Sequence, residues 1–233
     1  MFMRRRLGLA AALLLVACTA IAQNGNDRGL MTIEELYLQD DLTIRVLRTQ
    51  ALSVEREHKL AALEQATDLI GTVDERALLS ILRVLATDGS SWQVRVGGRR
   101  MYDYPDVRRE AVRVIGEVGG RSAEVILREV IQYDRNPLVL SEAVYALRST
   151  GISADTGTAT VLANLMNREL SRVNPDNNLM YASLLTLESL ASDGNEAISN
   201  TTLINNLLRI TTGPYTRLVR EKALDVLNVM RGM

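Results

Sequence analysis

Few residues of this chain have side chains suited to catalysis or metal binding. Histidine occurs once in the 233 residues, as His58, and cysteine occurs once, as Cys18. His58 lies in a charged run, residues 55–59, where a solvated surface histidine is the simplest interpretation. A zinc site would need several carboxylates, and the sequence shows no cluster with ligand spacing. We therefore expect no catalytic residue, no metal site and no cofactor.

Side chains suited to recognition lie together in residues 88–104. This stretch holds the only tryptophan, Trp92, together with Arg95, Arg100 and Tyr102. Tryptophan, tyrosine and arginine are enriched at the hot spots of protein interfaces. We therefore predict these four side chains as contacts for a protein partner. A structural alternative stays open, in which Trp92 covers the edge of the neighbouring helices.

The same stretch is predicted to form a β-hairpin inserted between helices. Gly97-Gly98 separates two short runs of β-prone and aromatic residues, and two-residue Gly-Gly loops favour tight hairpins. Pairing Val96 with Arg99 around this turn sets Arg95 opposite Arg100.

The elements around this insert repeat along the chain. The motif has a small residue, an apolar residue, any two residues and a second apolar residue. It begins at Ala111, Ala143, Ser183 and Ala223, at spacings of 32, 40 and 40 residues, with a weaker copy at Ala62. Self-similarity in this range indicates stacked helical repeats. The small residues are expected where adjacent helices approach closely.

The four prolines give an independent check on this phase. Each lies six to nine residues before one of the four small residues of the motif: Pro105, Pro137, Pro175 and Pro214. Proline is well tolerated at the first position of a helix, because no internal hydrogen bond needs its missing N–H. Asn136 and Asn174 each precede a proline, which predicts an N-cap at both asparagines.

The best copy of the repeat, Pro-Asp-Val-Arg-Arg-Glu-Ala-Val-Arg-Val-Ile-Gly at residues 105–116, resembles a HEAT repeat. The resemblance is strong over residues 105–151, fair over 174–232 and weak over 53–87. It implies a solenoid of antiparallel helix pairs, usually a binding scaffold. The predicted fold class is therefore all-α, a HEAT-like α-α solenoid with one inserted loop or hairpin.

The second helix of each pair is expected at residues 73–86, 122–131, 158–170 and 201–211. An arginine follows an apolar pair in three of these helices, at Arg83, Arg128 and Arg209. In HEAT-like solenoids the second helices line the concave face, so the resemblance implies an inward basic ridge and a secondary set of partner contacts. In the alternative, these arginines only interact with the negative ends of their helix dipoles.

Residues 1–22 are interpreted as a secretion signal. Arg4-Arg5-Arg6 precedes an apolar run at residues 7–16, and Ala20-Ile21-Ala22 forms a small-x-small cleavage site. Residues 15–18 also fit a lipobox, which would make Cys18 a lipidation site and the only attachment of the chain to a membrane. In the other interpretation Cys18 is a small apolar residue of the signal. The chain is thus expected to be exported, either periplasmic or lipid-anchored in the cell envelope.

Residues 23–52 are expected to form a linker and a helical N-terminal cap, followed by the repeat domain at residues 53–233 with its insert at 88–104. The buried face of the cap helix is predicted from its apolar residues, which are Leu36, Leu38, Leu42, Val46 and Leu47. An open solenoid end exposes apolar surface that such a helix can cover.

Composition narrows the function. The formal net charge is −1, and loss of the three signal arginines takes it to about −4, which argues against nucleic-acid binding. The sequence therefore predicts a non-catalytic protein–protein interaction scaffold of the bacterial cell envelope, with a protein partner. The alternative is a HEAT-like enzyme subunit of the phycobilin-lyase type, which would need a chromophore or a reactive centre.

Overall fold

The computed structural model describes residues 33–89, 94–96, 99–151, 155–194 and 196–232, with side chains from residue 42 onward except in the two strands. The predicted secretion signal with Cys18 lies outside these residues, as does Trp92. The side chains of Leu36 and Leu38 also lie outside the description.

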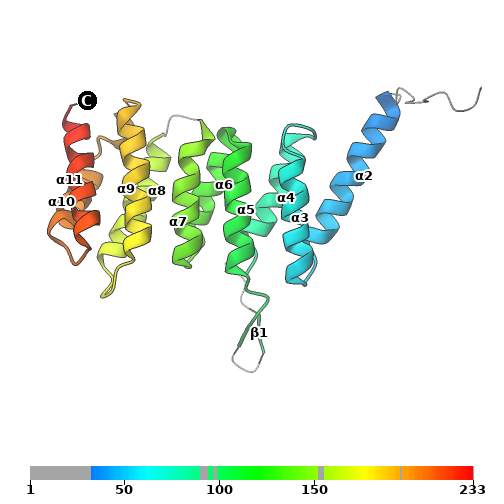
Figure 1. The fold of residues 1–233 in the computed structure, drawn as a ribbon, viewed down its shortest axis with the longest axis horizontal. Helices are drawn as coiled ribbons and strands as arrows, with labels where there is room; N and C mark the ends of the chain where they lie inside the picture. Colours follow the sequence, from blue (N-terminus) through cyan, green and yellow to red (C-terminus); the bar gives the residue numbers. More distant parts are fainter. Residues whose placement is uncertain (1–32, 90–93, 97–98, 152–154, 195, 233) are drawn as a thin grey trace, which may run out of the picture. The chain divides into compact units, whose positions relative to one another are not determined.

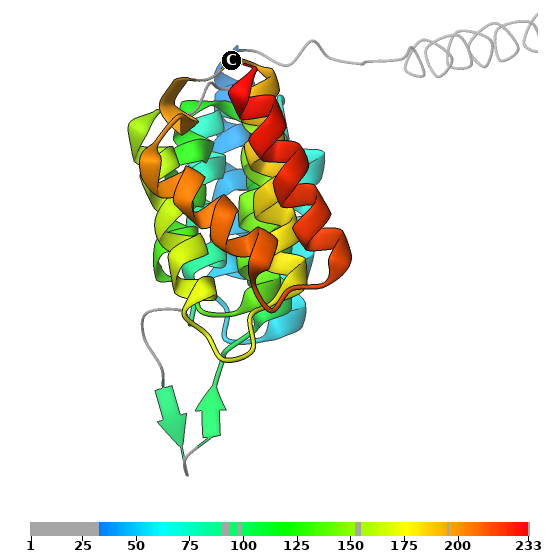
Figure 2. The ribbon, with the colours of Figure 1, turned by 90° about the vertical axis from the view of Figure 1, so that its left-hand side faces the viewer.

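The chain divides into two compact units, residues 1–39 and 40–233. Helix α2 (Ile33–Ala51) begins in the first unit. In the described residues of the second unit, nine further α-helices pack in two layers (Figures 1 and 2). The first layer contains α3 (Arg56–Asp68), α5 (Pro105–Val118), α7 (Pro137–Ala146), α9 (Asn177–Ser192) and α11 (Arg217–Arg231). The second layer contains α4 (Glu75–Thr87), α6 (Gly120–Tyr133), α8 (Thr156–Leu170) and α10 (Thr201–Thr212).

This arrangement confirms the predicted all-α solenoid. The bounds of the four second helices agree with the expected ranges to within two residues at each end. Two short 3₁₀ helices, η1 (Leu147–Thr150) and η2 (Glu196–Ile198), lie in the turns between helices.

The helix starts show which of the predicted caps form. Asn136 caps α7, because its side chain accepts the Leu138 N–H at 3.0 Å and Pro137 takes the first helical position. The prediction at Asn174 is wrong. Asp176 caps α9 instead, since its carboxylate accepts two backbone N–H groups at 2.9 and 3.0 Å. A carboxylate near a helix start also suits the helix dipole.

The small residues of the repeat lie in the core, as predicted. Ala111, Ala143 and Ala223 are fully buried, and Ser183 is buried with its hydroxyl donating to the Leu179 carbonyl oxygen. Two first-layer helices also approach closely at Gly116 of α5, where an added Cβ would lie 2.8 Å from the Cβ of Ala146 in α7. This contact between α5 and α7 therefore admits only small side chains.

The expected buried face of the cap helix is partly wrong. Leu47 is fully buried, but Leu42 is 59% exposed and Val46 is 52% exposed. Leu47 and Ala51 face the core from α2, so the buried stripe is narrower than the apolar content of the helix suggests.

The apolar residues of α10 do not all face the core. Leu203, Leu207 and Ile210 are buried, whereas Ile204 and Leu208 are exposed. The reason is Asn206, which is buried because its side-chain amide donates to the Ala163 carbonyl oxygen of α8 at 3.1 Å. A buried polar group with a hydrogen-bond partner can hold a core position.

Candidate interaction surface

The insert forms the predicted hairpin at one edge of the second unit (Figure 1). Strands β1 (Val94–Val96) and β2 (Arg99–Met101) pair antiparallel, with Arg95 opposite Arg100 and Val96 opposite Arg99. This register is the one that the Gly97-Gly98 turn predicts. The side chains of Arg95 and Arg100 lie outside the described set, so their role as partner contacts stays a prediction, as does that of Trp92.

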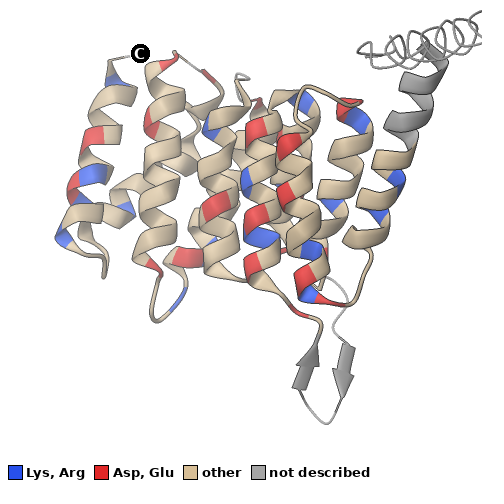
Figure 3. Ribbon diagram, turned by 45° about the vertical axis from the view of Figure 1, so that its right-hand side comes forward, with Lys and Arg blue, Asp and Glu red and all other residues tan. Residues whose placement is uncertain are grey.

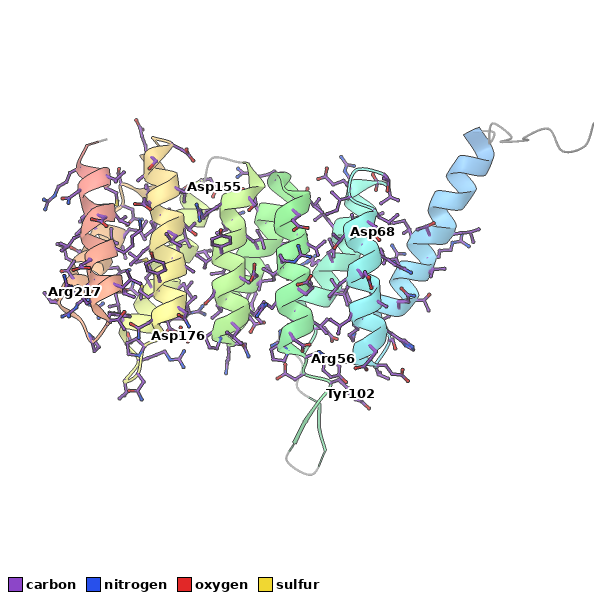
Figure 4. The ribbon with its side chains drawn as sticks, in the orientation of Figure 1. Arg56, Asp68, Tyr102, Asp155, Asp176 and Arg217 are labelled. Atoms are coloured by element: carbon purple, nitrogen blue, oxygen red, sulfur yellow. The ribbon has the colours of Figure 1, made fainter. Side chains whose placement is uncertain are left out.

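Tyr102 is the one predicted contact of the insert whose side chain the structure describes. It is exposed and lies where β2 meets the helices (Figure 4). Its φ is +62°, a conformation that is uncommon for residues other than glycine. This kinked backbone leaves Tyr102 accessible beside the base of the hairpin.

A buried guanidinium holds both ends of the insert. Arg108 in the first turn of α5 is 4% exposed. Its Nη1 donates to the Asp88 carbonyl oxygen at 3.1 Å and to Asp103 Oδ1 at 2.5 Å, which are the start and the end of the insert. Its Nε donates to Asp134 Oδ2, in the α6–α7 connection, at 2.7 Å. One side chain therefore fixes the two ends of the hairpin segment to each other and to the next repeat.

These contacts keep Arg108 charged in the interior. Burial alone would lower the pKa of Arg108, but the hydrogen bonds and negative charges of Asp103 and Asp134 raise the pKa above its ordinary value. The pair with Asp134 is almost wholly desolvated, because the side chains are 4% and 2% exposed.

A second buried cation supports the start of the insert. Lys59 of α3 is 4% exposed, and its Nζ lies 2.8 Å from Asp88 Oδ2 and donates to the Ala51 carbonyl oxygen at 2.9 Å. On the other side of the insert, the Tyr104 hydroxyl donates to the Val54 carbonyl oxygen at 3.2 Å. We call Lys59, Asp88, Asp103, Arg108 and Asp134 the hairpin clamp.

Among the described helices, a buried cation at this repeat position occurs only beside the insert. Lys59 and Arg108 are each the fourth residue of a first-layer helix, and the fourth residues of α7 and α9 are the apolar Leu140 and Met180. These four are buried, whereas the fourth residue of α11, Arg220, is exposed. Sequence reasoning missed the clamp. A cation at this repeat position is not a sufficient signal, because Arg220 at the same position of α11 is exposed.

The three arginines of the expected ridge do not form an uninterrupted basic surface. Arg83 of α4 makes a two-point pair with Glu129 of α6, at 2.7 and 3.0 Å. Arg128 is bound to Asp155 at 2.8 Å. Arg209 only approaches the Asn167 side-chain oxygen at 3.5 Å and follows the exposed Leu208, so it is out of phase with the other two.

Acidic residues are interspersed with lysine and arginine over the helices (Figure 3). Several close pairs join neighbouring repeats, as between Arg56 and Asp106, whose Nη2 and Oδ2 are 2.5 Å apart. Whether Arg83, Arg128 and Arg209 also contact a partner stays a prediction.

The described residues show little that resembles a reactive centre. His58 is an exposed surface histidine, with Nδ1 3.0 Å from Ser53 Oγ and Nε2 3.5 Å from Glu55. No group of histidine, cysteine and acidic side chains within the described ranges could hold a metal ion. In the same part of the chain, the helices are all too short or too polar to cross a membrane.

Comparison with protein families gives a match to part of the chain. Residues 102–174 match a family model of HEAT repeats. The matched range contains α5, α6, α7 and α8 and ends in the connection before α9. No curated protein matches the chain.

Proposed function

We propose that this chain, whose residues 102–174 match a model of HEAT repeats, is a non-catalytic protein–protein interaction scaffold exported to the bacterial cell envelope. HEAT repeats commonly mediate contacts between proteins. We propose further that the hairpin of residues 88–104 is the principal contact with the partner. The arrangement that supports this is the hairpin clamp.

A clamped insert is suited to binding for an energetic reason. Ordering a loose loop at an interface costs conformational entropy, which is subtracted from the affinity. Here Arg108 holds Asp88 and Asp103, so the ends of the insert are already fixed in the free protein. Burying two cations costs free energy, because each must be desolvated. A connection that served only as a linker would not need them.

The hairpin register suggests the charge of the partner. Arg95 lies directly opposite Arg100, and like charges at directly opposite positions destabilise an antiparallel pair. An acidic surface on the partner would relieve this repulsion. We therefore propose that the hairpin binds an acidic patch.

A double substitution tests the hairpin. Replacing Arg95 and Arg100 with alanine should weaken capture of the envelope partner, with the larger loss at low salt, where charges are least screened. The free energy of unfolding should change by less than about 0.5 kcal/mol per site, the usual range for surface substitutions. Affinity capture from the envelope fraction and urea denaturation measure the two effects.

The matched control removes the same charge elsewhere. Arg220 and Arg231 on α11 are both exposed, and their double alanine variant should capture the partner normally. Unchanged capture by the hairpin variant, with normal folding, would exclude the hairpin as the principal contact.

The proposed export is tested by a separate measurement, the identity of the mature N-terminus. The sequence of residues 1–22 supports cleavage, so the mature protein should begin at Gln23 if it is soluble or at an acylated Cys18 if it is a lipoprotein. Intact-mass analysis of the protein from the envelope fraction distinguishes the two. A mature protein that retains Met1 would contradict the proposed export.

A further inference from the structure

A groove of about 390 Å³ lies between α4 and α6, in the second layer of helices. Its charged lining is Arg76 and Arg83 from α4 with Arg121 and Glu129 from α6, and Val125 and Ile126 of α6 supply apolar surface. The hairpin is not part of it. A concave site with an apolar wall and a few charged groups is the usual form of a ligand pocket.

The cations of the groove differ in how far they are neutralised. Arg83 is paired with Glu129, and Arg121 is shared between Glu124 at 2.5 Å and Asp155 at 3.2 Å. Arg76 is exposed and has no ion pair among the described residues. The groove therefore presents one arginine whose charge is available to a ligand.

Two arginines of the groove lie at equivalent positions near the starts of their helices, so their positive charges are close to each other. Arg76 and Arg121 are the second residues of α4 and α6, which pack side by side. They thus repeat the same positive charge on two adjacent helices, and both line the groove. An anion bound there would lie near two guanidinium groups.

The apolar surface of the groove is specific to this repeat. Val125 lies two residues before the buried Leu127 and is 47% exposed. The residues two places before the corresponding buried residues of the other second-layer helices are polar, namely Ser80, Asn164 and Asn205. Valine is a poorer helix former than the long unbranched polar residues that suit an exposed helix position. Its presence favours a contact with an apolar side chain.

We propose that this groove binds a short acidic segment of a protein partner, with one apolar side chain against Val125 and a flanking carboxylate on Arg76. We infer an acidic ligand because its charge would complement the arginines of the groove. The carboxylate of Glu129 also lines the groove and would repel a doubly charged phosphate more than a single carboxylate. The inference rests on the proposed scaffold function but does not depend on the hairpin.

Synthetic peptides test the groove with the full mature chain. The probe is a fluorescein-labelled peptide with one leucine between aspartate and glutamate, and binding is followed by fluorescence anisotropy. Arg76→Glu should raise its Kd at least about tenfold, because an attraction becomes a repulsion. Val125→Ser should raise it about fivefold by removing apolar contact area.

Matched controls separate the groove from the overall charge. Arg220→Glu makes the same charge change at an exposed site on α11 and should leave the Kd within about twofold, because exposed charges farther apart than a Debye length are screened. A peptide with asparagine and glutamine in place of its acids, and one with serine in place of leucine, should both bind more weakly. Inorganic phosphate should not displace the acidic peptide.

Several results would overturn the inference. These are no binding of the acidic peptide, equal weakening by Arg76→Glu and Arg220→Glu, equal binding of the serine peptide, or displacement by phosphate. The Arg95→Ala/Arg100→Ala variant should bind the peptide normally. If the peptide results fail while partner capture still depends on the hairpin, only the groove proposal is refuted. If the peptide results hold while partner capture does not depend on the hairpin, only the hairpin proposal is refuted.

Discussion

Replacing Arg108 with methionine should lower the free energy of unfolding by about 3 kcal/mol, at the lower end of the range for breaking a buried ion pair from one side. The loss arises because Asp134 Oδ2 is left in the interior without its guanidinium partner, and because Asp103 Oδ1 loses its contact with Arg108. The lower end applies because Asp134 Oδ1 keeps its two backbone donors, the N–H groups of Arg135 and Asn136 at 2.6 and 2.8 Å. Urea denaturation followed by circular dichroism measures the change.

The adjacent residue supplies a close control. Arg109 has a side chain that is 53% exposed and lies 3.8 Å from Glu142. Exposed pairs contribute about 0–1 kcal/mol, so Arg109→Met should be nearly neutral. Arg108→Lys should fall between the two methionine variants, because one ammonium group cannot reproduce the fork of the guanidinium. Equal stability of the two methionine variants would show that Arg108 does not hold the insert.

The helices and the hairpin register could be predicted because each depends on local sequence. The repeat of small and apolar residues sets the faces of α5, α7, α9 and α11, and the Gly97-Gly98 turn fixes which strand residues are opposite each other. The boundaries of the second helices were equally accessible, since turn residues and apolar spacing mark both ends.

The hairpin clamp could not be predicted because it depends on distant partners. A charged residue in the first turn of a helix normally indicates a surface position. Arg108 is buried only because Asp134 lies 26 residues later in the chain and Asp88 lies 20 residues earlier. The buried face of α10 could not be predicted for the same reason, since Asn206 reaches its partner Ala163 across 43 residues.

Aligning the repeats does not show which arginines of the predicted basic ridge are neutralised by ion pairs. Alignment compares equivalent positions, so Arg83 and Arg128 were expected to line up as free cations. An ion pair instead joins different positions in neighbouring repeats, as in Arg83 with Glu129 and Arg128 with Asp155. Arg76 lines the same groove and has no ion pair among the described residues. It does not follow an apolar pair, so that pattern did not select it.

Because α5 and α7 are in close contact at Gly116, we expect a change from glycine to alanine there to have the opposite of its usual effect on stability. Changing glycine to alanine inside a helix normally stabilises a protein by about 1 kcal/mol. Gly116→Ala should instead destabilise it by about 1–2 kcal/mol, because the new Cβ would lie 2.8 Å from Ala146 Cβ and 3.3 Å from Ala146 Cα. Both atoms are close to the backbone of α7 and cannot move aside as the end of a long side chain can.

A double-mutant cycle isolates this contact. Ala146→Gly alone should lower the stability by about 1 kcal/mol through helix propensity. The double variant Gly116→Ala/Ala146→Gly moves the methyl group from α7 to α5 without adding volume, so its stability should return close to that of the wild type. The expected coupling is about 1–3 kcal/mol between the two sites, within the range for residues in contact. Additive effects, or a Gly116→Ala protein more stable than the wild type, would show that the two helices can separate at this point and that Gly116 does not set their distance.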